Sequence, residues 1–212
     1  MDTNTRSVPE ENAFTIDCKD VILREFLATD LDHFHSLTWQ PEIHEYLPGW
    51  NVSKEQRKDW FINYEIPENK QFFNTVSKGE DIGDLRLRLG IILKETGEFI
   101  GWCCSGMKDE LPPPNREIMY AISKDHRGRG YTTQASQGMT NYLFESTNVE
   151  VLSAIALIDN IPSNRVIDKC GFNFQSMIEI DNEKYNYYKL EKKDWAGNLT
   201  TFRPLPHNSN TL

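Results

Sequence analysis

Alternating apolar and polar side chains predict strands in the middle of the chain. Residues 85–91 carry leucine or isoleucine at every second position, the period of a half-buried strand. Residues 95–98 predict a turn, and residues 99–104 predict the antiparallel partner strand. A proline-rich loop at 111–114 precedes a third strand, 117–122. The centre of the chain is therefore predicted to be a sheet.

The N-terminal third predicts one strand and two helices. Residues 21–26 form a compact β-prone run. Thr29, with an acidic residue three positions later, signals the start of a helix that Pro41 stops. Ser53, with a glutamine three positions later, signals a second helix that is expected to end just before Pro67.

The C-terminal half predicts two helices, a strand and a hairpin. Apolar positions recur at helical spacing over residues 131–144, and residues 149–157 form an apolar strand. A short helix is expected between Pro162 and Gly171, because proline favours the first turn of a helix and glycine its end. Residues 174–190 then predict a β-hairpin.

The length of 212 residues fits one domain, which we place at 20–195 between a flexible N-terminal segment, 1–19, and a C-terminal tail, 196–212. The start has no signal-like segment, and no apolar run approaches the ~20 residues that span a bilayer. These features predict a soluble, cytoplasmic protein that does not bind membranes. It is expected to be a monomer or a homodimer.

A formal net charge of −9 disfavours nucleic acid as the main partner and favours cationic amines. The four cysteines lack metal-ligand spacing and are expected to be reduced thiols. His33 and His35 are two positions apart on a predicted helix, so they point to different sides. No metal site is expected.

A glycine loop joins the third central strand to the long helix. Gly128 and Gly130 allow a tight turn that brings backbone N–H groups close to a ligand, and the positive end of the helix dipole faces the same point. Four basic side chains lie within six residues of this otherwise acidic chain: Lys124, His126, Arg127 and Arg129. Together the strand, the spaced glycines and the helix predict a phosphate-binding loop.

Two common nucleotide loops do not fit, because Thr133 replaces the third glycine of a dinucleotide loop and the Gly-Lys-Ser/Thr ending of a triphosphate loop is absent. Residues 125–130 instead resemble the acetyl-coenzyme A pyrophosphate loop of the GNAT superfamily of N-acetyltransferases, Gln/Arg-x-x-Gly-x-Gly/Ala, with Asp125 in the first position as a departure. The resemblance implies cofactor contacts from Arg127, Gly128, Arg129, Gly130, Tyr131 and Thr132.

A second motif makes the resemblance more specific. Asn160, Ser163, Lys169, Gly171 and Phe172 are spaced as in the RimJ/RimL-type branch of GNAT enzymes, and the likeness covers residues 20–192. It implies an α/β (α+β) fold with a mixed, mostly antiparallel sheet flanked by helices. The sheet would be splayed between its fourth and fifth strands to admit the pantetheine arm.

The resemblance also implies roles for residues near the splay. Backbone groups of Ile122 would bond the pantetheine amides, and Asn160 would either hold one of these amides or only shape its turn. Ser163 is the candidate acid, because Ile167 stands where many relatives have a tyrosine; its alternative role is a helix cap. Glu117 is the candidate base, with a solvent-facing strand glutamate or a water-mediated proton transfer as alternatives.

The predicted function is acetyl-coenzyme A-dependent N-acetylation of a primary amine by direct transfer in a ternary complex. The acceptor stays open between a small-molecule amine and a protein N-terminus. The aromatic segment 39–50 is either a packed connection or a wall of the acceptor pocket. A non-catalytic acyl-coenzyme A sensor and a protein-interaction module are the alternatives.

Overall fold

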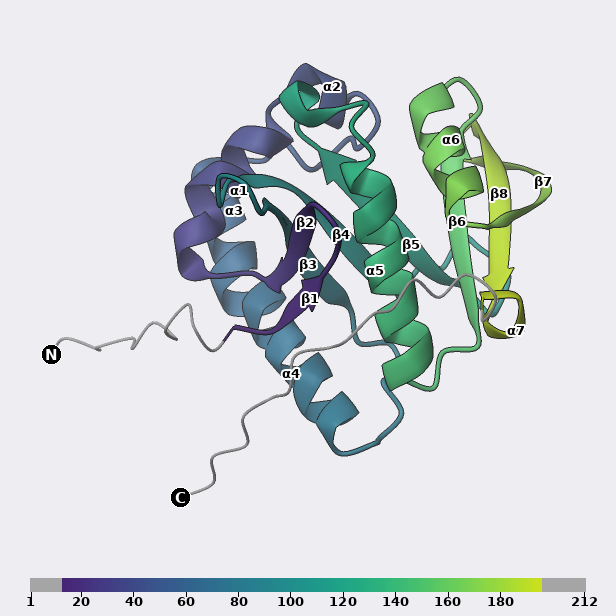
Figure 1. Ribbon diagram of the computed structural model, residues 1–212. Helices are drawn as coiled ribbons and strands as arrows, with labels where there is room; N and C mark the ends of the chain where they lie inside the picture. Colours follow the sequence, from purple (N-terminus) through teal and green to yellow (C-terminus); the bar gives the residue numbers. More distant parts are fainter. Residues whose placement is uncertain (1–12, 196–212) are drawn as a thin grey trace, which may run out of the picture.

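The computed structural model describes residues 13–195, which form one layer of strands between two layers of helices (Figure 1). The sheet has the order β1-β2-β3-β4-β5-β6-β8-β7, and every pair of neighbours is antiparallel except β5 and β6. The strands are β1 (Thr15–Asp17), β2 (Val21–Glu25), β3 (Leu87–Leu93), β4 (Phe99–Met107), β5 (Arg116–Ile122), β6 (Val151–Leu157), β7 (Asn173–Ile180) and β8 (Glu183–Glu191). The predicted fold class is confirmed.

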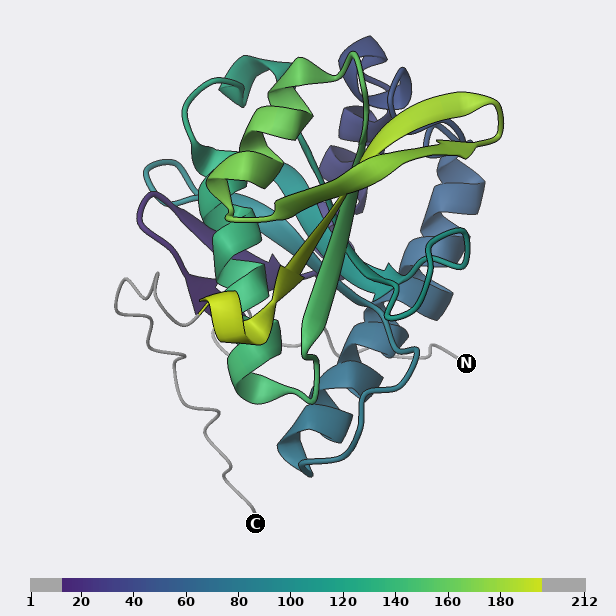
Figure 2. The ribbon, with the colours of Figure 1, turned by 90° about the vertical axis from the view of Figure 1, so that its right-hand side faces the viewer.

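The helices cover both faces of this sheet. They are α1 (Leu31–Thr38), α2 (Pro41–His44), α3 (Lys54–Trp60), α4 (Ile66–Ser77), α5 (Tyr131–Ser146), α6 (Ile161–Lys169) and α7 (Lys192–Trp195). In Figure 2, α5 and α6 lie on one side of the sheet, and α1 to α4 lie on the other. Within residues 13–195, none of these helices has the length and apolarity needed to cross a membrane.

Each face of the sheet has its own apolar core. Leu89 and Cys103 pack with Met139 of α5 on one face, and all three are fully buried. Cys104 packs with Phe34 of α1 on the opposite face. Adjacent Cys103 and Cys104 therefore point to opposite faces, as predicted for strand neighbours.

The sheet opens between β5 and β6. β4 pairs with β5 from Gly101↔Ile122 to Met107↔Arg116, whereas β6 meets β5 only at Glu117↔Ser153. The β6 side of β5 therefore has no strand partner beyond Glu117, and β6, β8 and β7 diverge from the rest of the sheet (Figures 1 and 2). This is the splay that was expected between the fourth and fifth predicted strands.

Two expectations differ from the structure. Residues 13–19 are not an irregular segment, because β1 pairs with β2 and Ile16 is fully buried; residues 1–12 and 196–212 lie outside the described part of the chain. The helix that begins at Ser53 does not end before Pro67. It continues from α3 through a π-helical turn, Phe61–Glu65, into α4, and Pro67 occupies the first turn of α4, where the missing N–H is tolerated.

Candidate functional site

The glycine loop after β5 has the backbone geometry of an anion-binding turn. Ser123 caps a short 3-10 turn, Lys124–His126, and the chain then passes through Gly128 at φ +76° and Gly130 at φ +82° into α5. Both φ values lie in the left-handed region that favours glycine. A Cβ added to either glycine would meet no atom within 4 Å, so the space before α5 is open. Gly130 is the N-cap residue and has no side chain to cap the helix, which leaves its first N–H groups for a ligand.

The side chains of the loop contribute unequally. The Arg127 guanidinium donates to the backbone oxygen of Glu42 at 2.6 Å, so it anchors the loop to α2. Arg129 is exposed, and among residues 13–195 its side chain has no bonded partner. Tyr131 is half-buried, and Thr132 is buried. The open backbone of the loop is therefore the better candidate to bind a phosphate, because the Arg127 guanidinium is already bonded to Glu42.

Gln40 also holds the loop, from the same segment as Glu42. Its Nε2 donates to Ser123 Oγ at 3.2 Å, and its Oε1 accepts from the Lys124 N–H at 2.9 Å. No local sequence pattern indicates this contact, because Gln40 lies more than eighty residues earlier in the chain. Segment 39–50 is thereby fixed to the glycine loop at its N-terminal end.

At the open edge of β5, Asn160 caps α6. Its Oδ1 accepts from the Ser163 N–H at 3.2 Å, so Asn160 shapes the turn, whereas the cap role considered for Ser163 is wrong. The Asn160 Nδ2 has no hydrogen-bond partner among the described residues. Ile122 is the last residue of β5 and lacks a partner on β6. Ile167 is 2% exposed and belongs to the core.

Tyr120 contacts Ser163 across the opening between β5 and α6. The Tyr120 hydroxyl lies 3.0 Å from Ser163 Oγ and donates to the Ser163 backbone oxygen at 3.1 Å. Burial raises the pKa of this phenol, so it stays protonated at neutral pH. The sequence did not single out Tyr120, because only the fold brings the two residues together.

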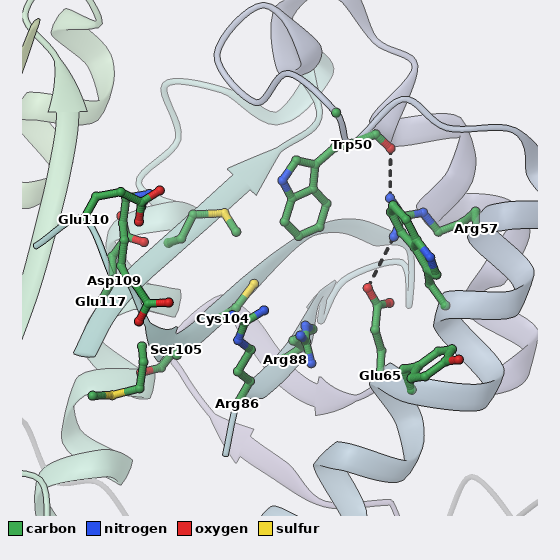
Figure 3. Close-up of a pocket in the computed structure, with 17 residues that line it drawn as sticks. Trp50, Arg57, Glu65, Arg86, Arg88, Cys104, Ser105, Asp109, Glu110 and Glu117 are labelled. Carbon is green, nitrogen blue, oxygen red and sulfur yellow. Dashed lines mark hydrogen bonds and ion pairs between the residues drawn. The ribbon is translucent and has the colours of Figure 1, made fainter. Parts of the chain in front are cut away.

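A cavity of about 590 Å³ lies on the other face of β5 (Figure 3). Glu117 lines it, and the side chain is half-buried. Burial raises the pKa of Glu117 to about 7; Lys108 opposes this rise, and Glu110 adds to it. A carboxyl group that titrates near neutral pH is matched to proton transfer.

Arg57 organises the wall of this cavity opposite Glu117. It is 1% exposed, and it donates to the Trp50 backbone oxygen at 2.8 Å and to Glu65 Oε1 at 3.3 Å. Its guanidinium carbon also lies 4.9, 5.5 and 5.2 Å from the ring centroids of Phe34, Trp50 and Trp60. These three aromatic rings therefore surround the Arg57 guanidinium.

Segment 39–50 fits both of the interpretations that the sequence left open. Gly49 and Trp50 line the cavity, which makes this end of the segment a wall. The Trp50 ring also stacks on buried Trp102 at 5.2 Å, and Ile43 is buried in the same core, which makes the segment a packed connection.

The described part of the chain contains no group of three or more His, Cys, Asp or Glu side chains placed to hold a metal ion. The four cysteines are free. Burial raises the pKa of Cys104 and Cys170 to about 12, so neither thiol is an activated nucleophile at neutral pH.

Comparison with known proteins identifies the family. Residues 20–173 match the family model described as "Acetyltransferase (GNAT) domain", and the chain belongs to this family. The uncharacterized N-acetyltransferase YnaD of Bacillus subtilis (strain 168) is 25% identical over 188 residues, which are 85% of this chain and 98% of YnaD. The uncharacterized N-acetyltransferase p20 of Bacillus licheniformis is 31% identical over 141 residues, 59% of this chain and 78% of p20.

Solved structures support the same fold. The aminoglycoside acetyltransferase AAC(6')-Ib in complex with coenzyme A and kanamycin has a TM-score of 0.66 at 15% identity, covering 84% of this chain and 98% of that chain. RimL, a ribosomal L7/L12 alpha-N-protein acetyltransferase in complex with coenzyme A, has a TM-score of 0.67 at 15% identity, covering 84% and 97%. At these identities the likeness shows the fold.

Proposed function

We propose that this protein is an N-acetyltransferase of the RimJ/RimL type, which transfers an acetyl group from acetyl-coenzyme A to a primary amine. One observation carries the proposal. β5 joins the open glycine loop to the cavity with the near-neutral carboxyl of Glu117, and its β6 side is unpaired from Glu117 to the loop. The coenzyme A complexes of AAC(6')-Ib and RimL support the choice of cosubstrate.

The binding site for acetyl-coenzyme A follows the open edge. Backbone N–H groups from Gly128 to Thr132 would hold the pyrophosphate, because the space beside both left-handed glycines is open. The free edge of β5 up to Ile122 would bond the pantetheine amides as a missing strand would. The unpaired Nδ2 of Asn160 is the candidate donor to a pantetheine carbonyl.

Direct transfer needs a neutral amine and a proton for the leaving sulfur. Acetyl-coenzyme A supplies the reactive thioester carbonyl. Glu117 would take a proton from the ammonium, after which the amine nitrogen bonds to the acetyl carbon and the carbon–sulfur bond breaks. The nitrogen loses its second proton as the amide forms, and the Ser163 hydroxyl would relay this proton, giving its own to the departing thiolate and taking up the one from nitrogen. The Tyr120 hydroxyl lies 3.0 Å from Ser163 Oγ and would orient it.

Thermal unfolding with acetyl-coenzyme A tests the cofactor part of the proposal. A ligand at ~100 times its Kd adds about 2.7 kcal/mol, which raises the midpoint of a chain this long by several degrees. Free adenosine is the control, because it lacks the pyrophosphate and the pantetheine arm. We expect a shift with acetyl-coenzyme A only, followed by acceptor-dependent release of thiol. Absence of any shift at saturating acetyl-coenzyme A would contradict the proposal.

A further inference from the structure

Arg86 shares one row of the sheet with Glu117. Gly106 pairs with Glu117 between β4 and β5, and Leu87 pairs with Ser105 between β3 and β4, so Arg86 stands next to Gly106 on its other side. Neighbouring strands are about 4.8 Å apart, so the backbones of Arg86 and Glu117 are separated by roughly two such steps. Both residues line the cavity (Figure 3).

Gly106 determines where the Arg86 side chain lies. A Cβ at position 106 would come within 2.7 Å of Arg86 Cγ, 3.1 Å of Cδ and 3.2 Å of Nε. Real Cβ atoms essentially never approach to 2.7 Å, so the arginine side chain occupies space that the glycine leaves free. The arginine thereby lies across β4, in the direction of the strand that carries Glu117.

Arg86 differs in its pairing from the other two arginines of the cavity. Arg57 is paired with Glu65 at 3.3 Å, and Arg88 is paired with Glu68 at 2.6 Å. The Arg86 guanidinium has no hydrogen-bond or ion-pair partner within residues 13–195. It is exposed toward the cavity, where a ligand anion can reach all of its donors.

The opposite end of the row is acidic. Glu117 and Glu110 line the cavity there, and Lys108 is paired with Glu110 at 3.4 Å. An acceptor with amines alone would use the carboxyl of Glu117 but would place its other charges near the unpaired Arg86. An acceptor that is both cationic and anionic matches both ends, and a cavity of about 590 Å³ suits a small ligand.

We propose that the acceptor is an amine that carries a carboxylate a few bonds away, with Arg86 binding the carboxylate and Glu117 facing the amine. This inference rests on the proposed acetyltransferase function. The same chemistry has two sources: a free amino acid, or a peptide N-terminus with an acidic residue beside it. Arg86 is a specificity-determining residue in this scheme and takes no part in proton transfer.

The test is a comparison of matched acceptors, measured as thiol release from acetyl-coenzyme A. One arm pairs each of the common α-amino acids with its carboxamide, and the other pairs peptides that have Asp or Asn as their second residue. For at least one pair we expect kcat/KM of the carboxylate form to exceed that of the amide by about tenfold or more, the scale of one hydrogen bond to a charged group. The arm with the higher kcat/KM identifies the source.

Variants assign the preference to Arg86. Arg86→Gln is expected to raise KM for the carboxylate form by about tenfold with little change in kcat, and to leave the amide unchanged. Arg86→Lys is expected to restore part of the preference, because it restores the charge. Gly106→Ala, which keeps the arginine but displaces it, is expected to resemble Arg86→Gln. Lys70→Gln is the charge-matched control, since Lys70 is exposed on α4 and lies outside the cavity.

Two failures are distinguishable. If the wild-type protein binds acetyl-coenzyme A but acetylates only amines without a carboxylate, or none of the acceptors tested, the carboxylate inference is wrong and cofactor binding stands. The inference is equally wrong if Arg86→Gln leaves the preference for the carboxylate intact. If acetyl-coenzyme A neither stabilises the protein nor loses its acetyl group, the proposed function itself fails.

Discussion

Glu117 stands at the last point where β5 is paired on both sides, and this position sets its acidity. Gly106 of β4 and Ser153 of β6 flank it in the sheet, and burial raises its pKa from 4.5 to about 7. We expect kcat/KM to rise with pH through an apparent pKa of about 7, because only the carboxylate accepts a proton. Glu117→Gln should remove this rise and lower turnover by about a hundredfold or more, with unchanged stabilisation by acetyl-coenzyme A. Survival of turnover would favour a water-mediated proton transfer.

The same carboxyl should affect stability. Its pKa is higher in the folded state than in the unfolded state, so the free energy of unfolding falls as pH rises from about 4.5 through 7. Glu117→Gln should remove a loss of about 3 kcal/mol between pH 4 and 8. Urea unfolding at both pH values measures this, and identical pH dependence in wild type and variant would contradict the raised pKa.

Ser163 and Tyr120 should act as one unit. Ser163→Ala removes the proposed proton donor, and Tyr120→Phe removes the hydroxyl 3.0 Å from it. We expect each substitution to lower kcat by about tenfold or more while the KM for acetyl-coenzyme A changes little, and the double variant to be no slower than Ser163→Ala. Independent, multiplicative losses would show that Tyr120 does not act through Ser163.

At the residue level, local spacing located the loop glycines, and both have a left-handed backbone. Glu117, which the family resemblance suggested, lines the cavity, and its role as a base stays a prediction. Gln40 and Tyr120 were missed because their contacts depend on chain segments that are distant in sequence. The placement of Arg86 depends on the register between β3 and β4, which the alternation of side chains does not determine.

Two left-handed glycines at the ends of different helices, Gly130 before α5 and Gly79 after α4, separate stability from cofactor binding. Gly130 at φ +82° opens the helix, and Gly79 at φ +68° follows α4, away from the loop; neither has an atom within 4 Å of an added Cβ. Gly130→Ala and Gly79→Ala should therefore each cost about 1–2 kcal/mol of stability. Only Gly130→Ala should also weaken acetyl-coenzyme A binding, by about tenfold, as measured by calorimetry. Equal losses of affinity in both variants would mean that the loop is not the binding site.

Element boundaries followed local signals unless tertiary packing changed them. Period-two alternation identified β3, and the turn at 95–98 identified β4 as its antiparallel partner. The Ser53 cap identified the start of α3, where Ser53 Oγ accepts from the Gln56 N–H at 3.2 Å. The three-residue β1 is too short for a periodic signal and is held by the burial of Ile16. Pro67 suggested a helix end, but a π-helical turn lets the helix continue through it.

At the scale of the whole molecule, the acidic chain surrounds a cavity whose charges are mixed. The net charge of −9 favoured cationic partners, yet the cavity contains the unpaired Arg86 beside its carboxylates. Total charge describes the average surface, whereas selectivity depends on which few groups remain unpaired in one site. The acceptor therefore could not be predicted from composition.

Segment 39–50 touches both proposed binding regions: Gln40 and the Glu42 backbone hold the glycine loop, and Trp50 forms part of the cavity wall. Binding of one substrate should therefore change the Kd of the other, which is cooperativity between the two substrates. Thermodynamic reciprocity requires that coenzyme A change the Kd of the acceptor by the same factor as the acceptor changes that of coenzyme A. Gln40→Ala should bring that factor toward one, and an unchanged factor would mean that the two regions communicate by another route.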